Sequence, residues 1–311
     1  MTLLLYGLIY SSALVFLAAC VIRAVRYARM PVHLRWELYP VPHEDATRVK
    51  HGGSYFETTD WWTQPTHFNL WGELKVMVPE MLFLKGLWEF NRKMWFRSFP
   101  FHFGLYLLIG ASGLVTFCAL LGLGAPEVAA GALGPMLHYL AMCTGLLGSG
   151  LCLLGAVGLL IRRLSDEELK TYTTKGDIFN LLFFVVAIGL LLFGYVFRVP
   201  DSPGPVALVR GLLTFDTSLR IPGMLSAGLF AGALLVAYIP LTHMSHFIAK
   251  YFTYHSVRWD DVPSAKRAKI QAGIAESLTY RPTWSAAHVG ADGLRTWSDI
   301  AMTNPTNGTK K

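Results

Sequence analysis

Thr242-His-Met-Ser-His-Phe-Ile-Ala-Lys250 ends the last long apolar run of this chain, which begins at Ile221. A run of about 30 residues is long enough for one helix to cross a bilayer and to protrude on one side. Before Lys250 it contains no Asp, Glu, Lys or Arg, so His243 and His246 are its only strongly basic groups. A polar side chain at this depth is costly to bury and usually functional, and a neutral imidazole is a common ligand of haem iron. The run therefore predicts a membrane helix that supplies an axial ligand to a haem b.

The composition is typical of a membrane protein. The 311 residues have a mean hydropathy of +0.41, with 53% apolar and 15% charged residues, whereas soluble proteins are roughly a quarter charged. Five runs are long and apolar enough to span a bilayer; they are Leu3–Ile22, Phe99–Leu123, Met136–Ile161, Ile178–Phe197 and Ile221–Lys250. We therefore predict an all-α membrane protein with a bundle of five transmembrane helices.

The basic residues predict the orientation of this bundle. Of the 27 Lys and Arg residues, 24 lie between the first and second spans, between the third and fourth, or after the fifth. Because cytoplasmic segments retain basic residues, the N-terminus is expected outside and the C-terminal tail in the cytoplasm. The net charge of +7 then reflects topology, and it gives no reason to expect nucleic acid as a partner.

We expect four segments: a first transmembrane helix (1–30), a cytoplasmic arm with an interfacial helix (31–98), a four-helix haem-binding bundle (99–250) and a cytoplasmic docking tail (251–311). The amphipathic pattern from Leu74 to Arg97 predicts the interfacial helix, with a break near Pro79. The tail contains a predicted helix from Ser264 to Leu278. The tail as a whole is too small to form a hydrophobic core of its own.

The first half of the arm, Pro31–Asn69, is rich in His, Pro, Gly and aromatic residues and shows no helical or strand period. We expect an extended segment that lies on a partner protein. Its histidines are irregularly spaced and have no cysteine nearby, which favours solvent-facing or partner-facing imidazoles over a metal site; they are His33, His43, His51 and His67.

Two spans bring histidines to the same depth. His102 lies about five residues, roughly 7.5 Å of helix, inside the second span from Arg97, and His246 lies about four residues, roughly 6 Å, before Lys250. The two rings can therefore face one another across a gap that a porphyrin fills, with one ring nitrogen on each side of the iron. His243 lies one turn deeper; it can replace His246 as the ligand, hold a haem propionate or contact a quinone. A hydrogen-bonded structural histidine is the alternative at each position.

His138 stands apart, at the external end of the third span, and no other span histidine lies at its depth. It either ligates a second haem with a partner such as Met224, donates a hydrogen bond to a quinone, or is structural. The residues favour the last two roles. Gly104, Gly110 and Gly113 of the second span allow a flat macrocycle or another helix to approach closely.

Two motifs resemble a known family. The second span is entered by Trp95-Phe-Arg-Ser-Phe-Pro-Phe-His102-Phe-Gly, and the fifth ends in Pro240-Leu-Thr-His243-Met-Ser-His246-Phe. Together with the five predicted spans and the expected external N-terminus, these two motifs resemble the membrane cytochrome b family of the respiratory nitrate reductase gamma subunit. The long arm and the tail, from Val257-Arg-Trp-Asp-Asp to Thr296-Trp-Ser-Asp-Ile-Ala, are more similar to the versions in transmembrane redox complexes of sulfate-reducing bacteria.

The resemblance implies a haem b held by His102 and by His246 or His243. The nitrate reductase pattern has a further histidine where Ser112 and Gly113 stand here, and another high on the fifth span, so a second haem would have to be recruited through His138. The resemblance also implies menaquinone as a cofactor and the bacterial inner membrane as the location. The implied partners are a cytoplasmic heterodisulfide-reductase-like iron–sulfur subunit and, in sulfate respiration, often a periplasmic multihaem cytochrome c.

These observations predict an electron-transfer subunit of a respiratory oxidoreductase complex, either non-catalytic or reactive with quinone. It would pass electrons between menaquinone or a periplasmic cytochrome c and the cytoplasmic iron–sulfur subunit. One alternative is a haemless membrane anchor of a redox complex. The other, a small-molecule transporter, is disfavoured because the sequence shows no internal repeat.

Overall fold

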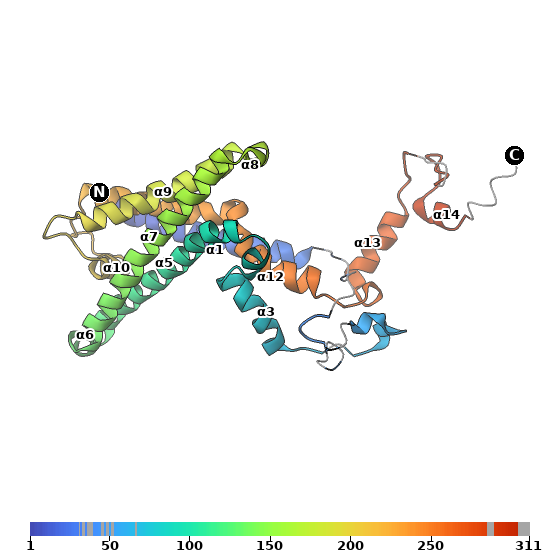
Figure 1. The fold of residues 1–311 in the computed structure, drawn as a ribbon, viewed down its shortest axis with the longest axis horizontal. Helices are drawn as coiled ribbons and strands as arrows, with labels where there is room; N and C mark the ends of the chain where they lie inside the picture. The colour runs from blue at the N-terminus through green and yellow to red at the C-terminus, as the bar shows by residue number, and fades with distance from the viewer. Residues whose placement is uncertain are drawn as a thin grey trace. The chain divides into compact units, whose positions relative to one another are not determined.

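The computed structural model of the chain describes residues 1–30, 32, 35, 40–44, 47, 50, 53–65, 67–284 and 289–303, and these residues form helices, turns and no strand (Figure 1). They divide into two compact units. The membrane unit comprises Met1–Ile22 and Leu74–His246, and the arm–tail unit comprises Arg23–Glu73 and Phe247–Lys311. Two of the arm histidines discussed above, His33 and His51, lie outside the described residues.

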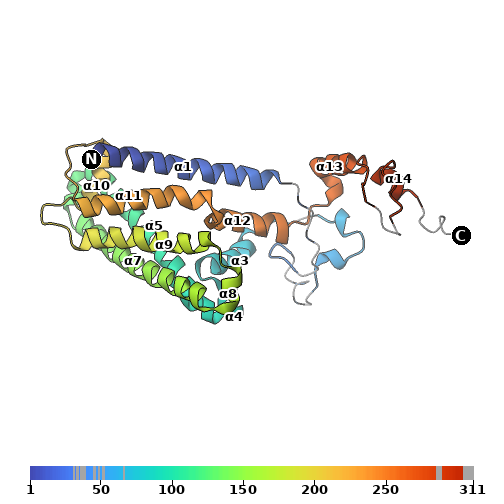
Figure 2. The same cartoon turned by 90° about the horizontal axis from the view of Figure 1, so that it is seen from above.

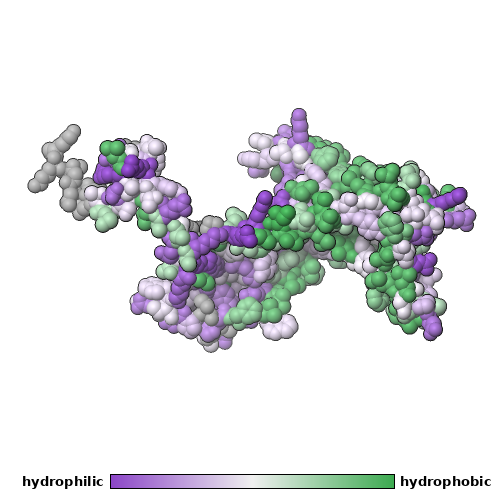
Figure 3. Space-filling model, turned by 180° about the vertical axis from the view of Figure 1, so that it is seen from behind, coloured by the Kyte–Doolittle hydropathy of each residue, from purple (hydrophilic) through white to green (hydrophobic). Residues whose placement is uncertain are grey.

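Five of the described helices are long and apolar enough to cross a membrane, which confirms the predicted number. They are α1 (Thr2–Arg29), α5 (Arg92–Gly124), α7 (Leu133–Ser165), α9 (Lys175–Val196) and α11 (Gly223–Tyr238), the last with a 3₁₀ extension to Leu241. The pair of α5 and α7 is inclined to the pair of α9 and α11, and α7 packs on α9 (Figures 1 and 2). On the face drawn in Figure 3, apolar residues cover the spans and hydrophilic residues gather at their ends.

Close glycine contacts join α5 to α7. A Cβ atom on Gly104 would lie 2.4 Å from the backbone nitrogen of Cys152, and one on Gly155 would lie 2.4 Å from that of Phe101. Gly104 therefore serves helix packing, whereas an added Cβ on Gly110 or Gly113 would meet nothing within 4 Å. The contact continues into a buried apolar cluster shared by all four helices; its members are Phe101, Cys152, Ala156, Phe184, Ala187, Ile188 and Leu235.

The fifth span is not the single helix from Ile221 to Lys250 that the sequence predicts. Helix α11 ends at Tyr238, and 3₁₀ turns follow at Ile239–Leu241 and His243–Ser245 before α12 (His246–Phe252) begins. Pro240 explains the break, because it has no N–H to donate and its ring collides with the preceding turn. Thr242 adopts an extended conformation and its hydroxyl accepts a hydrogen bond from the Met244 N–H, so it caps the new turn.

The predicted interfacial helix from Leu74 to Arg97 is also divided. Helix α3 (Leu70–Leu82) contains Pro79 without ending there, and α4 (Lys85–Phe90) follows a break at Leu84, whose φ of 53° is left-handed. Residues from Arg92 onward belong to α5. Two α5 side chains hydrogen-bond to carbonyls at the end of α3: Trp95 Nε1 donates to Phe83 O at 2.8 Å and Tyr106 Oη to Met81 O at 2.7 Å. These bonds replace the helical partners that the carbonyls of a helix end lack.

The membrane unit also contains three short helices between its spans. They are α6 (Pro126–Ala130), α8 (Glu167–Tyr172) and α10 (Pro205–Thr214). The loop after α10 is joined to the start of α1, since Thr2 Oγ1 donates to Leu219 O at 2.8 Å and Tyr6 Oη donates to Asp216 O at 3.0 Å. The N-terminal half of the first span is thereby fixed to the loop that precedes α11.

Residues of the arm contact the tail of the same chain inside the arm–tail unit. Arg35, 1% exposed, forms a 2.5 Å ion pair with Glu44, and its backbone N–H donates to Asp260 O at 2.6 Å. His43 Nε2 lies 2.7 Å from Asp261 Oδ2, so this imidazole faces the tail rather than solvent, whereas His67 is exposed. A 3₁₀ turn and α13 (Ala268–Leu278) confirm the predicted helix, and α14 (Trp297–Ala301) follows.

Candidate functional site

His102 is held by its own helix. Its Nδ1 atom lies 2.8 Å from Ser98 O and 3.3 Å from Ser98 Oγ, one turn earlier in α5. A carbonyl oxygen can only accept, so the bond to Ser98 O places the proton of a neutral ring on Nδ1 and leaves the lone pair on Nε2. This is the arrangement that fixes the tautomer and the direction of a metal-binding imidazole.

His246 brings a second imidazole to the same place. It is the first residue of α12, directly after the break in the fifth span. The ring centroids of His102 and His246 lie 6.0 Å apart, with an angle of 68° between the ring planes. A metal bonded to one nitrogen of each ring at ~2 Å would hold two ring centroids roughly 6 Å apart, since each centroid lies ~1 Å behind its nitrogen. The two predicted ligands are thus together, at a spacing that suits a metal between them.

His243 points to another group of side chains. Its side chain is 68% exposed, and its Nε2 atom lies 3.3 Å from Asn180 Nδ2 and 3.7 Å from Asp177 Oδ1. Tyr238 Oη donates to Asn180 Oδ1 at 2.9 Å. The buried Asn180 therefore links α9 to both sides of the break in the fifth span. Asn180 was not predicted from the sequence, although a single amide side chain in an apolar span indicates a functional or structural role.

His138 borders a cavity in the other half of the bundle. The cavity has a volume of about 340 Å³ and a mostly apolar lining from α1, α5, α7, α9, α10 and α11. Its few polar lining groups include Ser112, Tyr195 and Tyr6. Met224, the suggested partner of His138, is about half exposed and does not line the cavity. The cavity has the size and apolar character of a small-molecule site.

The ligand chemistry of the described residues favours a particular kind of metal centre. No group of three or more His, Cys, Asp or Glu side chains that could hold a metal ion occurs among them. Two imidazoles suffice for an iron whose other ligands come from a porphyrin. The apolar cluster that contains Phe101 continues to this place, since the Phe101 and His102 rings are in contact and Met244 packs against the cluster. The residues present fit a haem with histidine on both faces.

Comparison with known proteins assigns the family. The family model of the nitrate reductase gamma subunit matches residues 87–262, more than half of the chain. The match covers both His102 and His246. A comparison with curated proteins found no match. The chain therefore belongs to the nitrate reductase gamma subunit family, whose members are membrane cytochrome b subunits of redox complexes and bind haem b.

Proposed function

We propose that this multi-pass membrane protein is an electron-transfer subunit whose haem b is held by His102 and His246. The observation that carries the proposal is the 6.0 Å spacing of these two rings, which come from helices far apart in the sequence. Haem b, when bound, takes up and releases single electrons. Ser98 O keeps the proton of His102 on Nδ1, which directs Nε2 to the iron and strengthens it as a ligand. The apolar cluster that contains Phe101 lies beside His102.

A quinone is the second ligand that we propose, in the cavity beside His138. The His138 imidazole, on the lining of a mostly apolar cavity, can donate a hydrogen bond to a carbonyl of a quinone ring while the isoprenoid tail lies among apolar side chains. We favour this role of His138 over ligation of a second haem, because Met224 does not line the cavity. Menaquinone is the quinone that the resemblance to subunits from sulfate-reducing bacteria suggests.

The same resemblance suggests the remaining features. We propose a location in the bacterial inner membrane, with electrons passing between menaquinone or a periplasmic multihaem cytochrome c and a cytoplasmic heterodisulfide-reductase-like iron–sulfur subunit. His243 is the alternative ligand to His246. In this structure its Nε2 lies near Asn180 and Asp177, which favours a positioning role for it.

Substitution of the two candidate ligands tests the proposal. His102→Ala and His246→Ala should each abolish the low-spin, bis-histidine spectrum and lower the haem content of the purified chain, because each removes one of the two nitrogens that hold the iron. His138→Ala is the matched variant: it should retain the haem and slow reduction by quinol. Pyridine haemochrome assays and optical spectra measure haem, and stopped-flow reduction measures the quinol reaction.

Two results would contradict these assignments. An unchanged spectrum in both ligand variants would remove His102 and His246 from the haem site. A wild-type chain that purifies as an intact, folded protein without haem would favour the haemless membrane anchor.

A further inference from the structure

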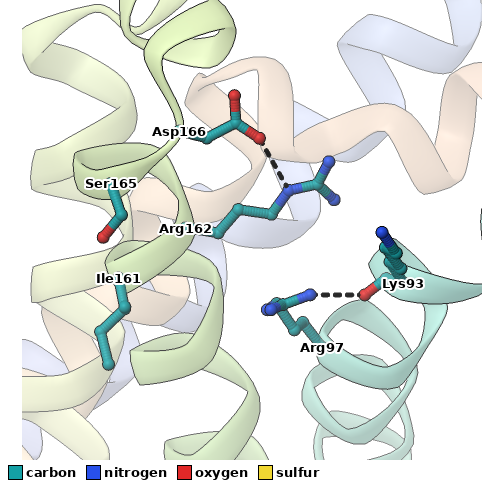
Figure 4. A pocket seen from close by; sticks show the side chains of 6 residues that line it. All are labelled: Lys93, Arg97, Ile161, Arg162, Ser165 and Asp166. Atoms are coloured by element: carbon teal, nitrogen blue, oxygen red, sulfur yellow. Dashed lines mark hydrogen bonds and ion pairs between the residues drawn. The ribbon is translucent and has the colours of Figure 1, made fainter.

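A second pocket lies at the end of the membrane unit where α5 begins and α7 ends (Figure 4). It has a volume of about 330 Å³, and neither His102 nor His246 lines it. Its lining comes from these two helices and from Asp166, which follows α7: Lys93, Arg97, Ile161, Arg162, Ser165 and Asp166. Figure 4 shows the side chains of Arg97 and Arg162 extending into the space between the two helices.

The pocket carries excess positive charge. Three of its lining residues are cationic and one is a carboxylate. Arg162 Nε lies 3.6 Å from Asp166 Oδ2, so the carboxylate is already engaged. Arg97 donates to the backbone oxygen of Lys93 at 2.7 Å, and no ion pair of Lys93 or Arg97 occurs among the described residues. Two cations are thus left to attract an anion.

An exposed apolar side chain lies among these cations. Ile161 lines the pocket and is 58% exposed. Arg162 also reaches Met94, with Nη1 2.9 Å from the thioether sulfur. Both helices cross the membrane, and their charged ends mark the level at which the apolar surface gives way to water. An anion bound here would have an apolar surface directly beside it.

We propose that this pocket binds the phosphate group of an anionic phospholipid. The planar guanidinium groups of Arg97 and Arg162 match phosphate oxygens, and Lys93 adds a point charge. Ile161 and the apolar remainder of the two spans offer a surface for the acyl chains. Basic pockets between transmembrane helices bind anionic lipid head groups through this combination of charge and adjacent apolar surface. An acidic segment of a partner protein would need the cations but not the apolar surface, which is why we favour lipid.

The test uses the full-length, haem-loaded chain. Native mass spectrometry of the detergent-purified protein, titrated with phosphatidylglycerol or phosphatidylcholine, counts the bound lipids. The Lys93→Gln/Arg97→Gln variant should bind phosphatidylglycerol at least about fivefold more weakly than the wild type, because two of the attracting charges are gone. The matched control, Lys85→Gln/Lys175→Gln, also removes two charges from this end of the membrane unit, and it should bind like the wild type.

The remaining measurements separate lipid from other anions. Phosphatidylcholine should bind more weakly than phosphatidylglycerol, and added salt should weaken only the latter. The haem spectrum of the Lys93→Gln/Arg97→Gln variant should be unchanged, which would show that the lost binding does not reflect misfolding. Equal lipid binding by this variant and the wild type would overturn the proposal. Displacement of phosphatidylglycerol by inorganic phosphate at similar concentrations would also overturn it. The same holds if the variant loses a co-purifying protein but binds as much lipid as the wild type.

Discussion

At the residue scale, hydrogen bonds inside the spans determine how the histidines of the candidate haem site are held. Ser98 O accepts a hydrogen bond from His102 Nδ1, which leaves the lone pair of the neutral ring on Nε2. On the other side, Asn180 lies between Tyr238 and His243, one residue from each side of the break at Pro240–Thr242. We infer that Asn180 is a positioning residue, because its hydrogen bonds to Tyr238 and His243 join the two sides of the turn that precedes His246.

Replacement of Asn180 should destabilise the membrane unit. In Asn180→Leu the partly buried hydroxyl of Tyr238 loses its acceptor, and a buried polar group without a partner costs about 1–3 kcal/mol. Thermal unfolding in detergent measures the loss, and the haem spectrum should broaden or shift if the His246 ring is displaced. The control is Ser112→Ala, whose hydroxyl bonds to Leu108 O of its own helix. Equal stability of the two variants would contradict the positioning role.

At the element scale, glycines set the distance between α5 and α7. A methyl group at Gly104 would meet the backbone of Cys152 and of Gly148, which cannot move without separating the helices. Gly104→Ala should therefore cost about 1–3 kcal/mol by overpacking. At Gly110 there is room, and Gly110→Ala should leave stability unchanged or raise it by up to about 1 kcal/mol, because alanine loses less entropy in a helix. Thermal unfolding of both variants compares them directly; a smaller effect at Gly104 than at Gly110 would contradict this account.

The helices that the sequence predicts can be compared with those of the structure. Hydropathy predicted five spans, and the depths of His102 and His246 predicted that their rings meet. The local breaks were harder to predict. Pro240 was visible in the sequence, but the length of the apolar run favoured a continuous helix. The left-handed Leu84 that separates α3 from α4 carries no sequence signal, since leucine rarely adopts that conformation.

Contacts between segments that are far apart in the sequence also could not be predicted, because no sequence pattern indicates them. The burial of Arg35 depends on Glu44, on Ser54 and on the backbone of Asp260, more than 200 residues later. No periodicity links these positions, so the arm was expected to be an extended segment lying on a partner. The ion pair and the aromatic contact of Arg35 with Phe56 instead form part of a core within the arm–tail unit.

At the scale of the whole molecule, the contribution of Asp261 to the stability of the arm–tail unit should be lost in acid. Burial raises the pKa of Asp261, but the hydrogen bond to His43 and the charges of His43 and Arg35 outweigh it, so its pKa lies below the usual 3.8. A carboxyl group with a lowered folded-state pKa stabilises the fold above its unfolded pKa, and this contribution is lost as the pH falls through the folded value.

Asp261→Asn should remove this pH dependence. Below about pH 4 the wild-type tail should lose hydrogen-exchange protection around Trp259, after correction for intrinsic rates, and the variant should change less. Asp60→Asn is the control, because Asp60 is exposed and asparagine tolerates its left-handed backbone. The same acid profile in Asp261→Asn and wild type would show that the pair with His43 does not stabilise the unit.

The orientation of the chain in the membrane determines which side of the membrane the histidine pair and His138 face. If all five candidate helices cross the membrane, the two termini lie on opposite sides, and the segments that would share the side of the tail contain 24 of the 27 basic residues. We therefore predict an external N-terminus. A fluorescent protein fused after Ala301, or inserted after Lys170, should fluoresce in the cytoplasm. Alkaline phosphatase inserted after Asp201, in the loop before α10, should be exported and active.

This orientation would place His102 and His246 near the cytoplasmic face and His138 near the external face, because α5 and α7 are antiparallel and His138 lies at the start of α7. Electrons exchanged between a quinone beside His138 and a cytoplasmic iron–sulfur partner would then cross part of the membrane by way of the histidine pair. Alkaline phosphatase that is active after Lys170 and inactive after Asp201 would show the opposite membrane orientation. Any soluble partner of the histidine pair would then bind on the external side.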